Sequence, residues 1–433
     1  MSKAEGERLA ILGGPRAVGD CPEELFRWPV VTQEDEQAVL GVLRAGKMSD
    51  TDITMQFEAE YAAWQGTQFA LASCNGTASL LEAMFGCGVG RGDEVIAPSL
   101  TYWASALPAF NLGATVVFAD IAPNSLCLDP ADLEHRITPR TRAIVPVHYC
   151  GHPADMGPIM AIARRHGVKV IEDVSHAHGA LYRGRLVGSI GEVAAMSMMS
   201  GKALPIGEAG MLCTDSREIY ERAVALGHYE RTAQELTLPD LAPLAGLPLG
   251  GFKHRLNQFS AAMGRVQLRH YPARMAEIQR AMSHFWDGLE GVSGLRPHRP
   301  APESGSTMGG WYNPVGHYLP EELGGLPVDR FIAAVNAEGG RTGRGCNSPL
   351  HLHPVLNVAD VYRDGKPTRL AFADRDLRQG PGTLPVSEAL AERCLGIPWF
   401  KRYLPEHIDR FIAAYRKVAG QADKLLGDTR AGT

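Results

Sequence analysis

One lysine differs from the others in its surroundings, because it follows an apolar run and lies among small residues. Lys202 ends the segment Ser-Met-Met-Ser-Gly-Lys at 197–202, and a glycine-rich turn, Gly-Glu-Ala-Gly, follows at 207–210. A lysine in such a place can be desolvated, which lowers the pKa of its amine and frees it as a nucleophile. A single lysine is usually an ordinary surface residue, so this segment is informative only together with others.

A second segment places a carboxylate and two histidines after an apolar run. Asp173 ends the run Val-Ile-Glu-Asp at 170–173, and His176 and His178 follow it. Open α/β sheets bind ligands at the carboxyl ends of their strands, where a buried carboxylate requires a cationic partner such as a protonated pyridine nitrogen. The two histidines are also compatible with a turn whose imidazoles are satisfied. Because no further ligands follow in a recognisable spacing, we predict no metal site.

A third segment could bind a phosphate group. In Ser-Cys-Asn-Gly-Thr-Ala-Ser-Leu at 73–80, Gly76 and Thr77 open an apolar run with helical spacing. The first N–H groups of a helix have no partner within the helix and favour an anion. An ordinary helix cap gives the same pattern, so this segment is a weak signal by itself.

These segments need a scaffold that brings strand ends together, and residues 69–214 predict one. Short runs rich in Val and Ile, bounded by Gly, Pro or Asp, are typical of strands buried on both faces. The predicted strands are 94–97, 115–118, 143–147, 168–171, 193–196 and 210–213. Residues 155–167 have the apolar spacing of a helix that Asp155 could cap and Gly167 could end. Strands alternating with such helices predict βαβ units around a largely parallel sheet.

The remainder of the chain predicts a second, smaller unit. Residues 239–251 carry three prolines and three glycines and are expected to form a loop. The helix-prone stretch 257–289 would lead from the large unit into the smaller one. A last helix is predicted to begin near Pro405, since an apolar stripe follows at helical spacing.

Composition excludes several classes of protein. The 433 residues are 45% hydrophobic and 21% charged with a formal net charge of −5, as expected for a globular chain of two or three domains. No basic stripe exists, so nucleic acid is not expected as a partner. No run of 18 apolar residues predicts a membrane helix, and the N-terminal apolar run is too short for a signal peptide. The eight cysteines are scattered without a CxxC pair, and we expect a cytoplasmic protein with reduced thiols.

Several motifs in one order resemble a known family. The series NGT, RGDEVIAPSLTY, GATVVFADI, VPVHYCGHPADM, VIEDVSHAHGA, SMMSGK and GEAGM is similar to the DegT/DnrJ/StrS family of nucleotide-sugar and aminocyclitol aminotransferases. The resemblance covers residues 46–268 and continues more weakly to the C-terminus. It implies an α/β, fold-type I pyridoxal 5'-phosphate aminotransferase. Its large cofactor-binding domain, 1–262, would have a mostly parallel sheet flanked by helices and an N-terminal arm over about 1–30. A smaller α+β domain would span 263–433.

The resemblance also assigns roles to residues that contact the reactive part of the cofactor. Lys202 matches the lysine that binds the cofactor covalently. Asp173 matches the aspartate that pairs with the pyridinium nitrogen and makes the ring an electron sink. His176 occupies the position that contacts the phenolic oxygen, and Tyr102 matches the aromatic residue stacked on the ring.

The phosphate of the cofactor would be held by two subunits. Gly76, Thr77 and Ser197 match the phosphate cradle of the family. The family pattern Gly-Tyr-Asn-Tyr-Arg stands here as Gly-Phe-Lys-His-Arg at 251–255, so Lys253 replaces an asparagine that reaches the phosphate of the neighbouring subunit. Lys253 can supply a positive charge instead. The resemblance thus implies a homodimer with shared active sites.

The substrates are predicted only by class. The donor would be an amino acid, glutamine or glutamate, and the acceptor a cyclic keto-polyol of the aminocyclitol type. Segments 252–259 and 384–388 favour this branch of the family, and the hydroxyl, carboxylate and imidazole groups of segments 49–52 and 348–353 suit a ring of hydroxyl groups. The alternative acceptor is a nucleotide-linked keto sugar, whose phosphates Arg341 and Arg344 could bind.

Other kinds of chemistry fit less well. Relatives that replace the lysine with histidine act as dehydratases, so the retained Lys202 favours transamination over another reaction of the same family. A nicotinamide dehydrogenase would need G-x-G-x-x-G between a strand and a helix, and Gly-Val-Gly-Arg-Gly at 88–92 fails this pattern. A regulator that only senses the cofactor would carry a DNA-binding module, and none is visible.

Overall fold

The computed structural model describes residues 8–427, and within them seven strands form the central sheet. Their order is β1-β9-β8-β5-β4-β2-β3. The bounds are β1 Phe69–Ser73, β2 Glu94–Pro98, β3 Thr115–Ala119, β4 Thr141–Ile144, β5 Lys169–Asp173, β8 Val193–Ser197 and β9 Gly210–Thr214. Each of the six predicted strands overlaps a strand of this sheet, although β4 ends at Ile144 and not at 147, and β1 is added to them. The mostly parallel sheet is confirmed too, except that β9 runs antiparallel to both of its neighbours.

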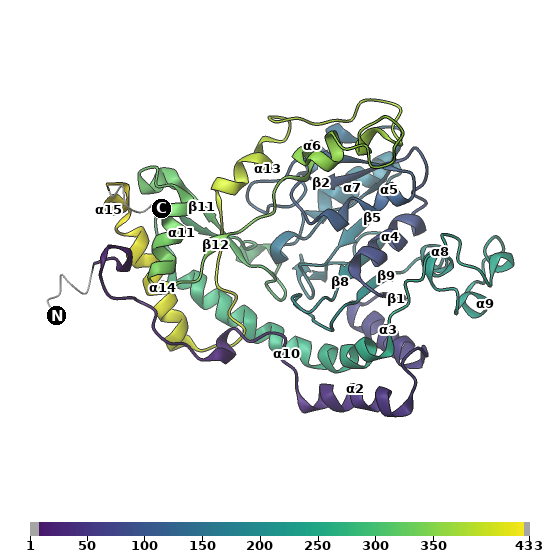
Figure 1. Cartoon of the computed structure of the whole chain (residues 1–433), viewed down its shortest axis with the longest axis horizontal. Coiled ribbons are helices and arrows are strands. Elements are labelled where there is room, and N and C mark those ends of the chain that lie inside the picture. Colours follow the sequence, from purple (N-terminus) through teal and green to yellow (C-terminus); the bar gives the residue numbers. More distant parts are fainter. Residues whose placement is uncertain (1–7, 428–433) are drawn as a thin grey trace.

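Helices cover this sheet, as Figure 1 shows. Helix α4 (Gly76–Gly86) packs against β8, β9 and α8 (Arg217–Gly227). Helix α7 (Met156–His166) is the helix predicted at 155–167, and Gly167 ends it with a left-handed φ of 66°. Asp155 does not cap it through its side chain, because its Oδ1 accepts a hydrogen bond from the hydroxyl of Tyr182 at 2.5 Å. The other helices are α2 Gln33–Ala45, α3 Asp52–Gln65, α5 Pro108–Asn111, α6 Pro130–Arg136, α9 Thr232–Glu235, α11 Val328–Ala337, α12 Pro354–Asn357, α13 Pro385–Ala389 and α15 Ala422–Leu426.

A second, antiparallel sheet lies in the C-terminal part of the chain. Its strands are β10 Leu295–Pro297, β11 Val315–Tyr318, β13 Cys394–Gly396 and β12 Gly343–Arg344, paired in that order. A small hairpin, β6 Leu181–Tyr182 and β7 Arg185–Leu186, stands apart from both sheets. Helix α14 (Pro405–Ala419) begins at the predicted proline and buries Ile408, Phe411, Ile412 and Tyr415 as expected. The smaller α+β unit of the sequence analysis is therefore present.

One long helix connects the two sheets. Helix α10 (Gln258–Gly288) packs against α2 and α3 and also against α14, and it crosses the molecule in Figure 1. The predicted domain boundary at 262/263 falls inside this continuous helix, so the division into 1–262 and 263–433 stays a prediction. Residues 1–7 of the expected arm and 428–433 of the expected small domain lie outside the described residues.

The described part of the N-terminal arm packs against the C-terminal part of the chain. Leu9, Val18 and Leu25 belong to the same buried core as α11 and α14. The carboxylate of Glu338 accepts hydrogen bonds from the N–H groups of Ala10 and Ala17, at 2.7 and 3.0 Å. The described part of the arm and the region around α11 and α14 thus stabilise one another. Within residues 8–427, no helix combines the length and apolar character needed to cross a membrane.

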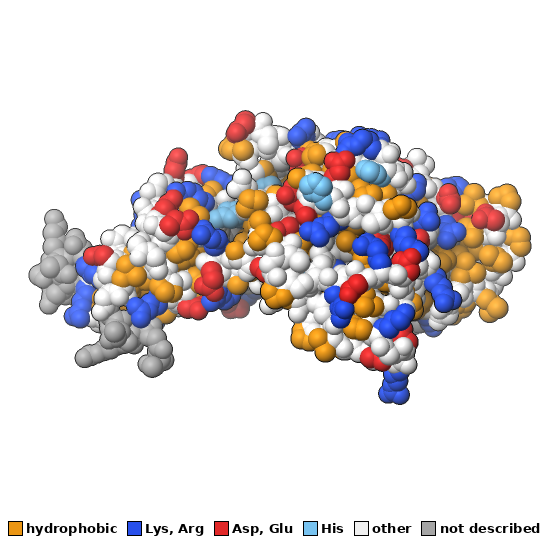
Figure 2. Space-filling model, turned by 90° about the horizontal axis from the view of Figure 1, so that it is seen from above, with side chains coloured by type: hydrophobic (Ala, Val, Ile, Leu, Met, Phe, Trp, Pro, Cys, Tyr) orange, Lys and Arg blue, Asp and Glu red, His pale blue; other side chains and the backbone are white. Residues whose placement is uncertain are grey.

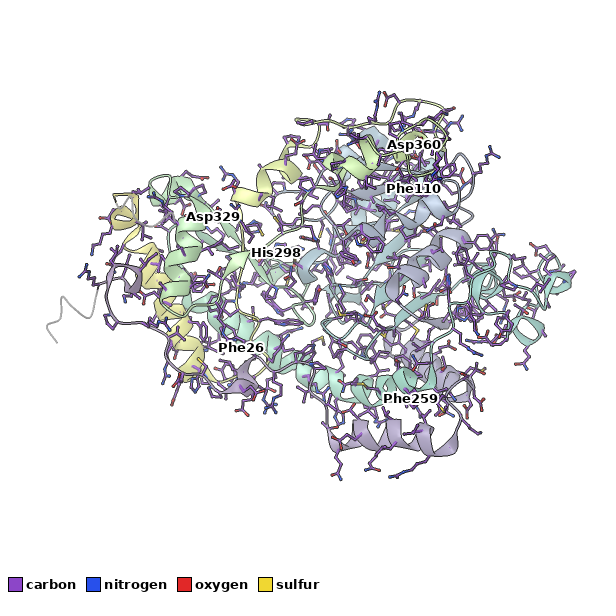
Figure 3. All side chains as sticks on the ribbon, in the orientation of Figure 1. Phe26, Phe110, Phe259, His298, Asp329 and Asp360 are labelled. Carbon is purple, nitrogen blue, oxygen red and sulfur yellow. The ribbon has the colours of Figure 1, made fainter. Side chains whose placement is uncertain are left out.

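Three histidine rings lie in contact with one another between the large-sheet part and the small-sheet part of the chain. His152 precedes α7, whereas His298 and His317 belong to the small-sheet region; the rings of His152 and His298 lie 5.1 Å apart, and those of His298 and His317 5.4 Å apart. His298 lies at this junction in Figure 3. Burial lowers the pKa of His152 to about 4, that of His298 well below its usual value, and that of His317 as well. The three imidazoles therefore stay neutral in the folded protein at pH 7.

We expect the free energy of unfolding to fall as the pH drops from about 6.5 towards 4. In this window the unfolded chain protonates these imidazoles and the folded chain does not, so the unfolded state binds more protons. His317→Phe keeps an aromatic ring beside His298 and removes one titrating group. It should reduce the difference between the urea midpoints at pH 7.5 and pH 5. His135→Gln, at an exposed site on α6, is the control. An unchanged pH dependence in His317→Phe would contradict this account.

Candidate active site

A cavity of about 490 Å³ opens at the carboxyl ends of β5 and β8. It is lined by all the residues that the sequence assigned to the cofactor except one, namely Gly76, Thr77, Tyr102, Asp173, His176, Ser197 and Lys202. β5 and β8 are parallel neighbours with Asp173 opposite Ala195, so the residues that follow both strands reach the same edge of the sheet. Lys253 is the exception and does not line this cavity in its own chain.

Lys202 is a buried amine. Its Nζ lies 4.0 Å from the centre of the Tyr312 ring, and the indole N–H of Trp28 donates to its carbonyl oxygen at 2.8 Å. Burial lowers the pKa of Lys202 to about 8, although the negative charge of Asp173 opposes the shift. About one amine in ten is then uncharged at pH 7, against about one in three thousand at the ordinary pKa of 10.5. This is the form that attacks a carbonyl carbon.

Asp173 is a buried carboxylate held by neutral donors. The hydroxyl of Ser105 donates to its Oδ2 at 2.6 Å, and the N–H of Ser175 donates to its Oδ1 at 3.0 Å. Among the described residues no cation is in hydrogen-bond contact with it. Because a buried carboxylate is costly without a positive partner, the site fits the protonated ring nitrogen of a pyridine.

His176 can donate one hydrogen bond into the cavity. Its Nδ1 accepts from the N–H of Cys150 at 3.3 Å, which assigns the remaining ring proton to Nε2. Burial, and then the charge of Lys202, lower its pKa well below the usual value, so the ring is neutral. It lies between the rings of Tyr149 and Tyr312, with centres 5.5 and 4.7 Å away. These features fit contact with the phenolic oxygen of the cofactor.

His178 lies outside the cavity wall. Its ring is buried, and neither ring nitrogen has a partner within the described residues. No group of three His, Cys, Asp or Glu side chains within residues 8–427 is arranged to hold a metal ion. Of the two histidines, only His176 lines the cavity.

The start of α4 forms a cradle for an anion. Asn75 precedes the helix, and its side chain accepts from the N–H of Ala78 at 2.9 Å. A Cβ on Gly76 would lie 2.6 Å from the Cβ of Ser197 and 2.7 Å from its Cα, so only glycine permits this close approach. The first N–H groups of α4 and the hydroxyls of Thr77 and Ser197 therefore meet at the cavity, as a phosphate group requires.

Several residues expected near the substrate lie elsewhere. His351 is buried, with Nδ1 2.6 Å from Ser99 Oγ and Nε2 3.1 Å from Glu388 Oε1. The Nδ1 of His353 accepts from a backbone N–H of its own helix. In segment 49–52, the carboxylate of Asp52 is bonded to Gln258 at 2.5 Å. Segments 49–52 and 348–353 do not line the cavity of this chain.

Four polar residues that line the cavity lie outside the sequence motifs: Ser105, Tyr312, Asn313 and Asn347. Ser105 belongs to no motif. Tyr312 and Asn313 stand between a Gly-Gly pair and Pro314, a turn signal that does not indicate a binding role.

Tyr102 was predicted, and it is 49% exposed at the cavity in the single chain. Lys253 is exposed, with Nζ 5.8 Å from the centre of the Tyr229 ring.

Solved structures identify the class of protein that has this fold and cavity. The aminotransferase from Psychrobacter cryohalolentis superposes with a TM-score of 0.79, over 92% of this chain and 100% of that chain, at 28% identity. The protein has the fold of the fold-type I pyridoxal-phosphate aminotransferases. It belongs to the DegT/DnrJ/EryC1/StrS aminotransferase family, whose sequence model matches residues 29–416. Enzymes of this family use pyridoxal phosphate, which agrees with the residues around the cavity.

Two relatives are similar over most of their length. The L-glutamine:scyllo-inosose aminotransferase of Streptomyces griseus is 35% identical over 425 residues, which are 95% of this chain and 97% of the relative. The L-glutamine:2-deoxy-scyllo-inosose aminotransferase of Streptoalloteichus tenebrarius is 34% identical over 385 residues, or 85% and 88%. The family inferred from the motifs is confirmed.

Replacing Lys202 by alanine should abolish transamination, because no other described amine lies in the cavity. The fold should stay intact. Borohydride reduction followed by peptide mass spectrometry should find cofactor on residue 202 of the wild-type protein and none on the variant. Lys366→Ala, in an exposed loop, is the control. A borohydride-reducible linkage that persists in Lys202→Ala would contradict the assignment.

Replacing Asp173 by asparagine keeps the shape of the side chain and removes its charge. We expect a loss of about a hundredfold in the rate of the donor half-reaction, or ~3 kcal/mol, because the ring nitrogen would no longer be held protonated. Ser105→Ala removes one neutral donor to this carboxylate and should cost less than about tenfold. Stopped-flow absorbance at full cofactor occupancy measures both. Near-normal turnover in Asp173→Asn would exclude this role.

Proposed function

We propose that this enzyme transfers an amino group from glutamine or glutamate to the ketone of a cyclic polyol. The observation that carries the proposal is the charge of the cavity wall. Among the described residues that line the cavity, Lys202 is the only lysine or arginine. Recognition of a nucleoside diphosphate relies on clustered or bidentate cations, whereas a ring of hydroxyl groups needs neutral donors and acceptors.

The arginines that could have bound a nucleotide are occupied elsewhere. Arg344 pairs with Asp329 at 2.7 Å and with Glu392 at 3.0 Å. The guanidinium of Arg341 lies over the ring of Phe26, 4.1 Å from its centre. Neither lines the cavity. This favours the cyclitol acceptor over the nucleotide-linked keto sugar.

The relatives support the same substrates. Both are named for glutamine as the donor and for a keto-cyclitol, scyllo-inosose or its 2-deoxy form, as the acceptor. The retained Lys202 supports transamination over other reactions of the family. We therefore assign glutamine as the first donor to test.

Six residues of the cavity would have distinct tasks in this reaction. Bound pyridoxal phosphate supplies an electron sink and carries the amino group between the two substrates. The Nζ of Lys202 takes the proton from the donor Cα and returns one to the acceptor carbon. Asp173 holds the proton on the ring nitrogen, and the Nε2–H of His176 binds the phenolic oxygen. Gly76, Thr77 and Ser197 bind the phosphate.

We further propose a homodimer in which Lys253 completes the phosphate site of the neighbouring subunit. In one chain, Tyr102, Trp103 and Tyr229 are each at least 39% exposed, although Tyr102 lines the cavity. Hydrophobic side chains also gather at the end formed by α8, α9 and the following loop, where Leu247 is 77% exposed (Figure 2). A second copy would bury these exposed side chains, and Lys253 lies beside one of them, with its Nζ 5.8 Å from the centre of the Tyr229 ring.

A donor–acceptor matrix tests the reaction, and competition binding tests the acceptor. Glutamine should convert the cofactor to its amino form, and scyllo-inosose or 2-deoxy-scyllo-inosose should reverse the absorbance change. We expect a nucleoside diphosphate not to compete with the cyclitol at micromolar concentration. If it displaces the acceptor there, and free cyclitol ketones neither bind nor react, the cyclitol proposal is wrong.

A further inference from the structure

The cavity wall that faces the cofactor-binding motifs comes from the C-terminal part of the chain. Tyr312 and Asn313 precede β11, and Asn347 follows β12. β11 and β12 both pair with β13, so one small sheet holds the segments that carry these side chains. The sequence motifs assigned no role to this wall.

Asn347 is held by a buried tyrosine. The hydroxyl of Tyr149 donates to Oδ1 of Asn347 at 2.8 Å and accepts from the backbone N–H of Asn347 at 3.0 Å. Tyr149 is fully buried, and its ring lies 5.5 Å from that of His176. With Oδ1 bonded, the side-chain orientation of Asn347 is fixed. Its Nδ2 has no partner within residues 8–427, so its two N–H groups are available to a ligand at the cavity.

Asn313 is held in an unusual backbone conformation. Its φ is 48°, although the following Pro314 favours an extended conformation for the residue before it. Trp311 and Cys150 also have positive φ, 55° and 50°, and the Nδ2 of Asn313 donates to the sulfur of Cys150 at 3.8 Å. Backbone outliers of this kind cluster at functional sites, and Asn313 lines the cavity. The Oδ1 of Asn313 has no partner within the described residues and can accept a hydrogen bond.

We propose that Asn313 and Asn347 determine acceptor specificity by binding hydroxyl groups of the cyclic polyol, and that Tyr149 is a positioning residue for Asn347. This inference rests on the proposed function and names the groups that would select its acceptor. A hydroxyl group both donates and accepts, so Oδ1 of Asn313 and Nδ2 of Asn347 complement two ring hydroxyls. Neutral amides suit a polyol and offer no positive charge to a phosphate.

The two half-reactions separate this role from a structural one. Asn347→Leu removes the amide at similar size, and Asn313→Gly removes the side chain where glycine tolerates the positive φ. For scyllo-inosose we expect kcat/KM of the acceptor half-reaction to fall about 10- to 100-fold in each variant, mainly through KM. The donor half-reaction with glutamine should stay within about threefold, at unchanged cofactor content and melting temperature.

Further variants test whether Tyr149 acts through Asn347. Asn111→Leu, the same exchange at an exposed position at the end of α5, should change neither half-reaction. Tyr149→Phe should weaken the acceptor half-reaction less than Asn347→Leu does. Because Tyr149 acts through Asn347, the double variant should lose no more than Asn347→Leu alone. Asn347→Gln, which keeps an amide, should recover part of the loss.

The outcomes distinguish this inference from the proposed function. If the wild-type enzyme aminates neither scyllo-inosose nor 2-deoxy-scyllo-inosose, the proposed function is wrong and this assignment falls with it. If the wild-type enzyme aminates them while the variants lose nothing, or lose both half-reactions equally, the assignment alone is overturned. Losses confined to the acceptor half-reaction support it.

Discussion

The structure depends on two opposite charges buried at one edge of a parallel sheet. Asp173 ends β5, and Lys202 follows the neighbouring strand β8. Burial favours the neutral amine, while the carboxylate favours the cation, and the resulting pKa of Lys202, about 8, keeps a useful fraction of nucleophile at neutral pH. Within the described residues, the carboxylate in turn accepts hydrogen bonds only from the neutral Ser105 hydroxyl and the N–H of Ser175, so its positive partner is left for a ligand to supply.

The antiparallel strand β9 brings the residues proposed to bind the phosphate to that edge. Gly210 lies opposite Ser73 of β1 and also opposite Ser197 of β8, so both strand ends meet beside it. The helix that follows β1 then begins against Ser197, where Gly76 leaves room for backbone contact. Strand pairing thus brings the start of α4 and the end of β8 together, and Lys202 lies in the loop that connects β8 to β9.

The C-terminal part of the chain supplies the other wall and different chemistry. Its cavity residues are an aromatic ring, Tyr312, and two neutral amides, Asn313 and Asn347, whereas the charged groups come from the large sheet. The N-terminal arm also contacts the site, because the indole N–H of Trp28 donates a hydrogen bond to the carbonyl oxygen of Lys202. Under the proposed function, substrate selection and cofactor chemistry would therefore be carried by separate segments.

The sequence by itself determined the local elements and the motif residues. Apolar runs gave six strands, glycine ended α7, and ordered motifs located seven residues that share one cavity. It could not determine which polar groups become partners, because these lie far apart in the chain. Folding decided the hydrogen-bond partners of His351, Arg344 and Ser105. It also decided the hydrogen bond from Tyr149 to Asn347, which are 198 positions apart. Tertiary structure likewise decided the antiparallel direction of β9. It also decided that Asp155 accepts a hydrogen bond from Tyr182 and does not cap α7, because a polar side chain bonds to the partner that folding brings near it.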